Sequence, residues 1–192
     1  VNDAPVANAA SSTTTEDQSV VVVLSGSDVD GDNLTFNLDS NASNGLVTLN
    51  GSLATYTPSA NYFGDDSFTF SVSDGIESSS ASVSLSVLAV NDAPVLATVS
   101  DVSFDEDATG STSLTATDVD GDDLEFSISG GSDITATLIG SDVSFTAPQD
   151  YSGNETFTVS VTDGTIVDSQ SITVTVNAVN DAPVLSSIGN LQ

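Results

Sequence analysis

The sequence contains no lysine, arginine or histidine, so none of its acidic side chains can form an ion pair with another side chain. Its 28 Asp and Glu residues give a formal net charge of −28 at pH 7. A chain of this charge repels nucleic acids and anionic membrane surfaces, because both attract proteins through basic patches. We therefore expect no nucleic-acid partner and no direct membrane insertion, and the counterions must come from solution.

Cysteine, methionine and tryptophan are also missing. Without cysteine there is no disulfide framework, and without cysteine and histidine the usual ligands of zinc and copper are absent. Only carboxylates and hydroxyls could act as catalytic groups, and the acids recur with the repeat described below, which favours a scaffold over a single active site. We therefore predict that the chain is not an enzyme. No signal peptide or apolar membrane-spanning run occurs in the sequence, which favours a segment of a longer protein.

A six-residue motif, VNDAPV, begins at positions 1, 90 and 179, at a constant interval of 89 residues. Other motifs keep the same phase to within one residue: SDVDGDNL corresponds to TDVDGDDL, and SVSDG corresponds to SVTDG. Such self-similarity is the mark of tandem structural repeats. The sequence predicts a first repeat over 1–89, a second over 90–178 and the truncated start of a third over 179–192.

Each repeat alternates apolar and polar residues with the period of a β-strand and shows no helical stretch. Hydrophobic residues make up 38% of the chain, enough to bury a core despite the acidity. In the first repeat we expect an edge strand between Pro5 and Thr15, followed by strands near Ser19–Ser25, Leu34–Leu38, Leu46–Leu49, Ala54–Thr57, Ser67–Ser73 and Ala81–Val90. About seven short strands in about 90 residues predict an all-β chain of tandem immunoglobulin-like Greek-key β-sandwiches.

Asp accounts for 23 of the 28 acids, and the Asp residues gather in predicted loops. Asp28, Asp30 and Asp32 alternate along one loop, as do Asp118, Asp120 and Asp122 in the next repeat. Carboxylates that converge in this way repel one another unless a cation lies between them. Calcium fits best, since it takes 6–8 oxygen ligands from carboxylates, amides and carbonyls. The alternative is a polar hairpin turn without an ion.

Taken together, these motifs resemble the cadherin repeat, and in particular the bacterial cadherin-like tandem repeats of large surface adhesins. The resemblance covers both full repeats and rests on an early Glu, an Asp-x-Asp loop, an Asp-Gly turn and an Asn-Asp-x-Pro linker. In this sequence those elements are Glu16, Ser27–Asn33, Ser71–Gly75 and Asn91–Pro94, then Glu106, Ala116–Asp123, Ser160–Gly164 and Asn180–Pro183.

The resemblance implies calcium ions between successive repeats, with ligands from both repeats and from the linker. For the complete junction it implies Glu16, the linker residues Asn91 and Asp92, and Asp118, Asp120 and Asp163, with Asp122 as an additional ligand. The incomplete sites at the two ends would be formed by Asn2, Asp3, Asp28, Asp30 and Asp74, and by Glu106, Asn180 and Asp181.

The sequence departs from the cadherin pattern at two places. Ala89 and Ala178 replace the first Asp of the linker, and the Leu-Asp-Arg-Glu motif is missing, since its region Pro58–Gly64 contains no acid. Asp66 and its counterpart Glu155 are the nearest substitutes, and we include Asp66 among the predicted ligands. For Asp74 and Asp163 the alternative is a plain turn residue before glycine.

The resemblance implies a calcium-rigidified extender of a large extracellular adhesin or surface fibre, located at a cell surface and bacterial in origin. Its first partners would be neighbouring repeats of the same chain. Two alternatives are a binding module that contacts glycans or surface proteins, and homotypic assembly of identical chains into a filament, since a sandwich can add a strand to its neighbour's sheet.

Overall fold

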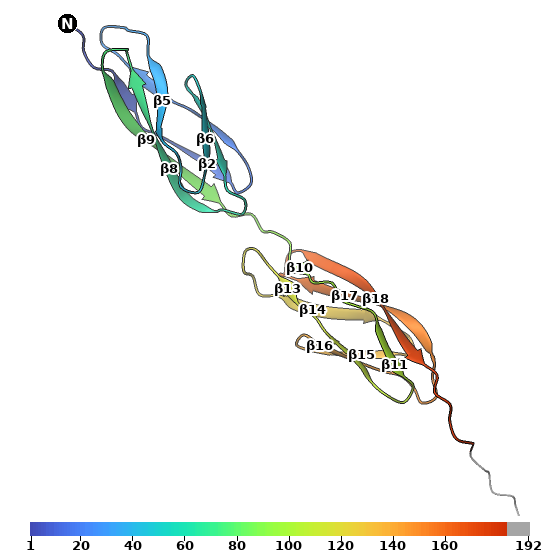
Figure 1. The fold of residues 1–192 in the computed structure, drawn as a ribbon. Helices are drawn as coiled ribbons and strands as arrows, with labels where there is room; N and C mark the ends of the chain where they lie inside the picture. The colour runs from blue at the N-terminus through green and yellow to red at the C-terminus, as the bar shows by residue number, and fades with distance from the viewer. Residues whose placement is uncertain (184–192) are drawn as a thin grey trace, which may run out of the picture. The chain divides into compact units, whose positions relative to one another are not determined.

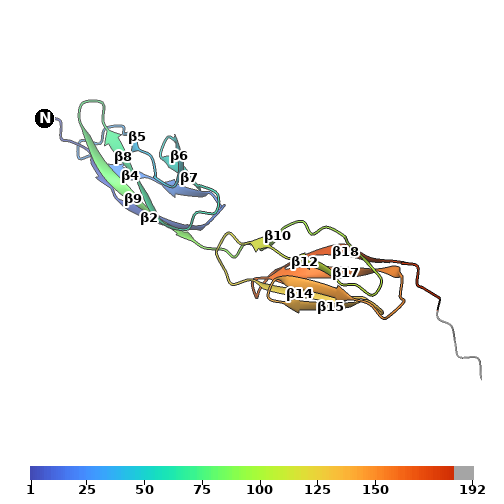
Figure 2. The same cartoon turned by 60° about the horizontal axis from the view of Figure 1, so that its bottom comes forward.

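The computed structural model describes residues 1–183, and it contains β-strands and loops but no helix in that range, so no helical membrane span occurs there. The chain divides into two compact units, Val1–Asn91 and a second unit that begins at Asp92. Figures 1 and 2 show the strands of each unit arranged in two facing layers. The predicted third repeat, 179–192, extends from residue 184 onward outside the described residues.

The first unit is built from a four-stranded and a three-stranded sheet. The four-stranded sheet has the order β2 (Ala10–Thr15), β9 (Ser78–Leu88), β8 (Gly64–Ser73) and β5 (Thr35–Ser40). The three-stranded sheet has the order β3 (Val20–Val23), β7 (Leu53–Pro58) and β6 (Gly45–Asn50). β2 pairs with β9 in parallel, and the other neighbours are antiparallel.

A short additional pair joins β1 (Val6–Asn8) to β4 (Ser25–Ser27). Two strands predicted as continuous are therefore divided. The edge strand predicted between Pro5 and Thr15 breaks at residue 9 into β1 and β2, and the strand predicted over Ser19–Ser25 breaks at Leu24 into β3 and β4. These breaks turn seven predicted strands into nine observed segments.

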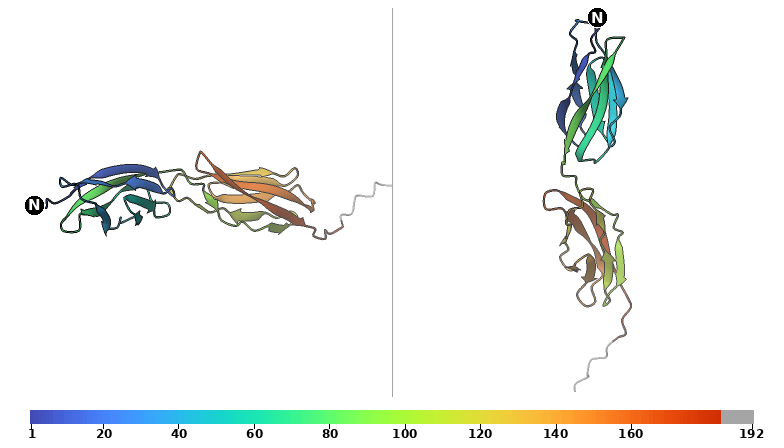
Figure 3. Two further views of the ribbon diagram at one scale, coloured as in Figure 1. Left: turned by 90° about the horizontal axis from the view of Figure 1, so that it is seen from above. Right: turned by 90° about the vertical axis from the view of Figure 1, so that its left-hand side faces the viewer.

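The second unit repeats this topology. Its four-stranded sheet comprises β11 (Val102–Asp105), β18 (Val167–Asn177), β17 (Gly153–Thr162) and β14 (Glu125–Gly130). Its three-stranded sheet comprises β12 (Gly110–Ser113), β16 (Asp142–Thr146) and β15 (Thr135–Ile139). β10 (Val95–Leu96) pairs with β13 (Ala116–Thr117), and β11 pairs with β18 in parallel. The views in Figure 3 show the two layers of each unit from two further directions.

The core of each unit lies between its two sheets, as the strand alternation predicts. In the first unit Phe68, Phe70 and Val72 of β8 face the core and are fully buried, together with the fully enclosed Tyr56 of β7. In the second unit Phe145 and Phe157 pack edge to face with ring centroids 5.3 Å apart. The acidic loops are left at the ends of each sandwich, where strands turn.

Candidate metal sites

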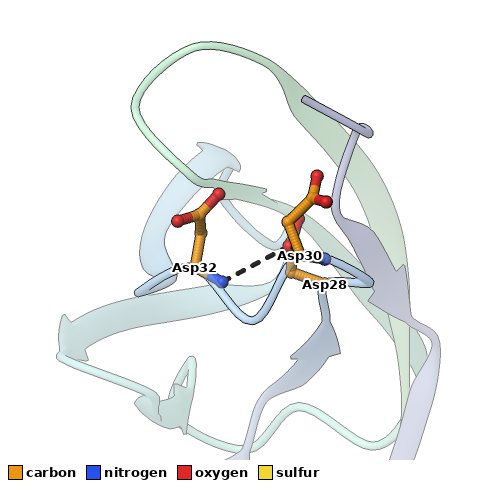
Figure 4. A group of neighbouring side chains, drawn as sticks. All are labelled: Asp28, Asp30 and Asp32. Carbon is orange, nitrogen blue, oxygen red and sulfur yellow. Dashed lines mark hydrogen bonds between the residues drawn. The ribbon is translucent and has the colours of Figure 1, made fainter. Parts of the chain in front are cut away.

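The loop between β4 and β5 brings three carboxylates together at one end of the first unit. Asp28 Oδ1 accepts hydrogen bonds from the backbone N–H groups of Asp30, Gly31 and Asp32 at 2.8, 3.1 and 3.4 Å. Gly31 has a φ of 82°, which lets the chain turn back over the Asp28 side chain. Figure 4 shows Asp30 and Asp32 standing on the same side of this loop. Carboxylate oxygens of the three Asp residues lie within 4.8 Å of one another.

Two neighbouring segments reach the same cluster. The backbone N–H of Asp3 donates to Asp30 Oδ2 at 2.7 Å, and the Asn2 side-chain amide donates to Asp74 Oδ2 at 2.9 Å. Figure 2 shows the N-terminal segment at the end of the unit where β8 turns into β9, the turn that carries Asp74. The Asn2 amide and the backbone N–H groups of Glu77 and Ile76 lower the pKa of Asp74. The structure thus brings Asn2, Asp3, Asp28, Asp30 and Asp74 together at one end of the unit.

The second unit repeats the arrangement in the loop between β13 and β14. Asp118 Oδ1 accepts from the backbone N–H groups of Asp120, Gly121 and Asp122 at 2.9, 3.0 and 3.3 Å. Asp92 donates its backbone N–H to Asp120 Oδ2 at 2.7 Å, as Asp3 does to Asp30. Carboxylate oxygens of Asp118, Asp120 and Asp122 lie within 4.8 Å of one another.

The electrostatics of this second cluster are repulsive. Burial raises the pKa of Asp122, and the charges of Asp118, Asp120 and Asp163 raise it further. Asp163 itself occupies the turn between β17 and β18, where its Oδ1 accepts the backbone N–H groups of Thr165 and Ile166 at 2.6 and 2.7 Å. Asp163 and Asp74 therefore fill the turn role that the alternative interpretation assigned to them. The charge of Asp163 also acts on Asp122 of the second cluster, and Asp74 accepts the side-chain amide of Asn2, whose neighbour Asp3 contacts Asp30.

Glu16 lies at the opposite end of the first unit, directly after β2. Its backbone N–H donates to the Leu88 carbonyl at 2.9 Å, and its Oε1 accepts the Val90 N–H at 2.5 Å. Only 4% of Glu16 is exposed, and it is the one buried charged or polar residue in the part of the chain that the structure describes. Its Oε2 is enclosed and has no hydrogen-bond partner.

The corresponding end of the second unit contains a third acidic cluster. Glu106 Oε1 accepts the Val179 N–H at 2.5 Å, and the Asn180 side-chain amide donates to the Asp181 carbonyl. Beside them, carboxylate oxygens of Asp107, Asp150 and Asp181 lie within 4.8 Å of one another. The Asp150 N–H also donates to Asp107 Oδ1, at 3.4 Å.

Sequence reasoning left Asp32, Asp107 and Asp150 out of the ligand set. The repeat phase could have pointed to Asp107, which follows Glu106 as Asp17 follows Glu16. Asp150 lies in the part of the second repeat that corresponds to Pro58–Gly64 of the first. Because Pro58–Gly64 contains no acid, no ligand was expected there, and the counterpart of Asp150 is Asn61. In the first unit the Asn61 N–H donates to Asp17 Oδ1 at 3.1 Å, as the Asp150 N–H donates to Asp107 Oδ1 in the second. Asn61 therefore makes the same backbone contact as Asp150, but its side chain is an amide and not a carboxylate.

Asp66 has a different environment from the other predicted ligands. Its carboxylate accepts the backbone N–H groups of Ser43 and Asn44 at 3.0 and 2.8 Å and the Tyr56 hydroxyl at 3.0 Å. Burial raises the pKa of Asp66, but the backbone donors Asn44, Ser67 and Ser43 and the Tyr56 hydroxyl outweigh it, and the net direction is downward. These donors account for the position of Asp66 without an ion, and its role as a ligand stays a prediction.

Glu155 contacts the corresponding loop of the second unit, between β14 and β15. It accepts the backbone N–H groups of Ser132, Asp133 and Ile134 at 2.9 to 3.0 Å, and also the Ser132 hydroxyl. These donors, led by the N–H groups of Asp133 and Ser132, lower the pKa of Glu155 to about 2. Both Asp66 and Glu155 therefore close the loop that joins the two sheets.

The donor set of the acidic loops fits a hard divalent cation. Among the described residues, enclosed carboxylate oxygens without a hydrogen-bond partner include Glu16 Oε2, Asp28 Oδ2 and Asp118 Oδ2. Buried charges in proteins are paired or coordinate metals, and this sequence contains no basic side chain to pair with them. The ligands available are oxygens of carboxylates, amides and backbone carbonyls, the set that calcium takes.

Comparison with solved structures identifies the fold. Human protocadherin-24 EC1-2 matches with a TM-score of 0.57 and 18% identity, over 90% of this chain and 98% of that one. The extracellular cadherin domains 1–4 of protocadherin gamma B7 match with a TM-score of 0.56 and 17% identity, over 89% of this chain and 49% of that one. The two units are cadherin-like tandem β-sandwiches.

An endo-fucoidan hydrolase from glycoside hydrolase family 107 matches at 25% identity with a TM-score of 0.40, and the chain spans 29% of its length. No curated protein sequence matches the chain. A family profile described as Bacterial Ig domain matches twice, over residues 2–86 and 91–177, which together include most of the sequence. The chain belongs to the bacterial Ig domain family and carries two tandem copies of that domain.

Proposed function

We propose that this chain is a calcium-stiffened extender segment of an extracellular bacterial adhesin or surface fibre. Calcium binds the acidic clusters at the ends of the units, and the tandem units act as spacers. The observation that carries this proposal is the set of enclosed, unpartnered oxygens of Glu16, Asp28 and Asp118 in a chain that has no basic side chain.

Each unit supplies an incomplete coordination sphere of its own. In the second unit, Asp118 Oδ1 is occupied by three backbone N–H groups, which leaves its enclosed Oδ2 directed to a cation. One carboxylate oxygen from each of Asp118, Asp120 and Asp122 lies within 4.8 Å of the others. Calcium needs 6–8 oxygens, so the remaining ligands would come from Asp163, from the linker residues Asn91 and Asp92, and from water.

The linker explains why bound calcium would stiffen the chain. Val90 donates to Glu16, and Asp92 donates to Asp120, so residues on both sides of Asn91 are already held to an acidic group of their own unit. Pro94 fixes its own φ and biases Ala93 towards an extended conformation. In the proposal, ions held by Glu16 and by the Asp118 loop also bind Asn91 and Asp92. Binding of these two residues restricts rotation about the backbone bonds of the linker.

A structural role also agrees with the chemistry of the chain. The acids recur from unit to unit, and the hydrogen bonds that position Asp28 and Asp118 are the same in both copies. Repetition of a site suits an array of equivalent spacers better than a single catalytic centre. In this proposal the partners are neighbouring repeats and identical chains, and the site of action is outside the cell.

Calcium titration by calorimetry and small-angle scattering in calcium and in EDTA test this proposal. We expect heat of binding, and in calcium a distribution of interatomic distances that shifts to longer values, with a larger radius of gyration. The double variant Asp118→Ala, Asp120→Ala should lose at least one binding event and the scattering change. Absence of binding would refute the calcium site, and binding with unchanged scattering would refute the stiffening.

Asp123→Ala is the matched control. Asp123 is exposed, directly follows the loop and lies outside the three-acid cluster, so its removal changes the net charge without removing a proposed ligand. This variant should bind calcium as the parent chain does. Equal loss of binding in Asp123→Ala and in the double variant Asp118→Ala, Asp120→Ala would mean that general charge, rather than a coordination site, attracts the ion.

A further inference from the structure

The three-stranded sheet of the first unit contains no acidic residue. Residues 18–27 and 40–64 include β3, β6, β7 and their flanking turns, and neither segment contains Asp or Glu. The other sheet of the same unit carries Asp39 on β5 and Asp65 on β8, and both are exposed. One outer face of this strongly acidic molecule is therefore electrically neutral.

That neutral face is also apolar and open to solvent. Val21 and Val23 of β3, Leu53 of β7 and Leu46 of β6 are 55, 66, 45 and 57% exposed. Their direct neighbours Val22, Ala54 and Val47 are buried, so the four exposed side chains share the outer side of the sheet. We call this surface, formed by Val21, Val23, Leu46, Thr48, Asn50, Leu53, Thr55 and Thr57, the neutral face.

The second unit shows that the fold does not require apolar residues at these positions. The cross-strand row Val23–Leu53–Asn50 of the first unit corresponds to Ser113–Asp142–Ile139. The next row, Val21–Thr55–Thr48, corresponds to Ser111–Ser144–Thr137. The same sheet thus folds with serine and aspartate on its outer side, and the valines and leucine of the first unit need another explanation.

We propose that the neutral face is a self-association surface whose occupant is the neutral face of a second copy of this chain. Between two copies with a net charge of −28, most contacts would bring carboxylates together and remove them from water without a counter-charge. Contact through the neutral face buries Val21, Val23, Leu46 and Leu53 and desolvates no carboxylate. A basic partner would instead be attracted to the acidic loops at the ends of the units.

The size of the face fixes the strength of the contact. Three strands about 4.8 Å apart and five residues long at about 3.3 Å each give a face of roughly 240 Å². Stable interfaces bury about 800 Å² on each partner, so a single pair of faces gives a weak, concentration-dependent dimer. The contact is isologous, since the same residues lie on both sides.

Sedimentation equilibrium of the whole chain from about 10 µM to about 1 mM tests this inference. We expect the average mass to rise from 19.3 kDa towards that of a dimer. The rise should be larger at about 1 M NaCl than at about 0.1 M, because salt screens the repulsion between the acidic chains. Monomer at every concentration and salt level would overturn the inference, as would association that weakens with salt.

The variants come from the second unit itself. Leu53→Asp, and the pair Val21→Ser, Val23→Ser, install residues that the same sheet accepts there, and each should raise the dissociation constant at least tenfold. Ser84→Asp on the exposed side of β9 adds the same charge to the opposite sheet and should leave the dissociation constant unchanged. Equal effects of Leu53→Asp and Ser84→Asp would overturn the inference. The measurement is made in EDTA, so that its outcome is independent of the proposed calcium sites.

Discussion

Glu16→Gln should change the stability of the first unit in opposite directions with and without calcium. Glu16 is 4% exposed, its Oε1 has one donor and its Oε2 has none. An unsatisfied buried group costs about 1–3 kcal/mol, and more when it is charged. In EDTA the neutral amide should therefore stabilise the unit by about 1 kcal/mol, which raises the melting temperature by about 4–8 °C for a unit of this size.

In calcium the same substitution removes a ligand. An ion present at about 100 times its dissociation constant stabilises the folded state by about 2.7 kcal/mol. Loss of binding, offset by the gain of about 1 kcal/mol from the neutral amide, leaves a net loss of about 1.7 kcal/mol and should lower the melting temperature by about 7–14 °C. Thermal unfolding followed by circular dichroism in both buffers measures the two shifts. Glu77→Gln, which removes an exposed carboxylate from the same unit, should change neither. A melting temperature that falls equally in EDTA and in calcium would refute the role of Glu16 as an ion ligand.

Three further measurements address the loops that join the sheets and the acidic turns. The pKa of Glu155 is lowered from 4.5 to about 2 by backbone N–H donors, so its contribution to the stability of the second unit is present above pH 4.5 and lost as the pH falls towards 2. Glu155→Gln should flatten that loss in acid unfolding curves, and a chain whose curve stays the same would contradict the assignment. Tyr56→Phe should cost about 1–3 kcal/mol in urea unfolding, because the charged carboxylate of Asp66 loses the hydrogen bond that the Tyr56 hydroxyl donates to it. Adding Asp66→Glu gives the first unit the Phe–Glu combination of Phe145 and Glu155, and should restore part of that loss. Gly121→Ala should weaken calcium binding in calorimetry, since φ at Gly121 is 78° and alanine there costs about 1 kcal/mol, whereas Gly51→Ala, with a φ of 59° in a turn distant in sequence from any predicted ligand, should not.

The sheets could be predicted from the sequence because their signal is local. Phe68, Phe70 and Val72 alternate with polar residues, and each faces the core as its period requires. The breaks at residues 9 and 24 could not be predicted in this way. They arise where the chain changes its pairing partner, from β4 to β9 at residue 9 and from β7 to β1 at Leu24, and partner choice is a long-range property.

The sequence predicted those acidic groups whose members lie close together in one motif, and it missed those that only the fold brings together. The spacing of Asp28, Asp30 and Asp32 correctly indicated a converging loop, since all three are held by one turn. Asp107 and Asp150 lie 43 residues apart, and only the fold brings them within reach of each other. The loop-closing contacts of Asp66 likewise come from backbone N–H groups, which leave no mark in the sequence.

The parallel pairing of β2 with β9, and of β11 with β18, determines how each unit would carry a pulling force. The chain enters near the first residue of β2 and leaves after the last residue of β9, and in a parallel pair these two points lie at opposite ends. Tension along the chain therefore shears the ladder, so that its hydrogen bonds are loaded together instead of opening one at a time. Six residue pairs resist in the first unit, Ala10↔Val83 to Thr15↔Leu88, and four in the second, Val102↔Val174 to Asp105↔Asn177. Under a steady pull, the second unit is the one that should yield first.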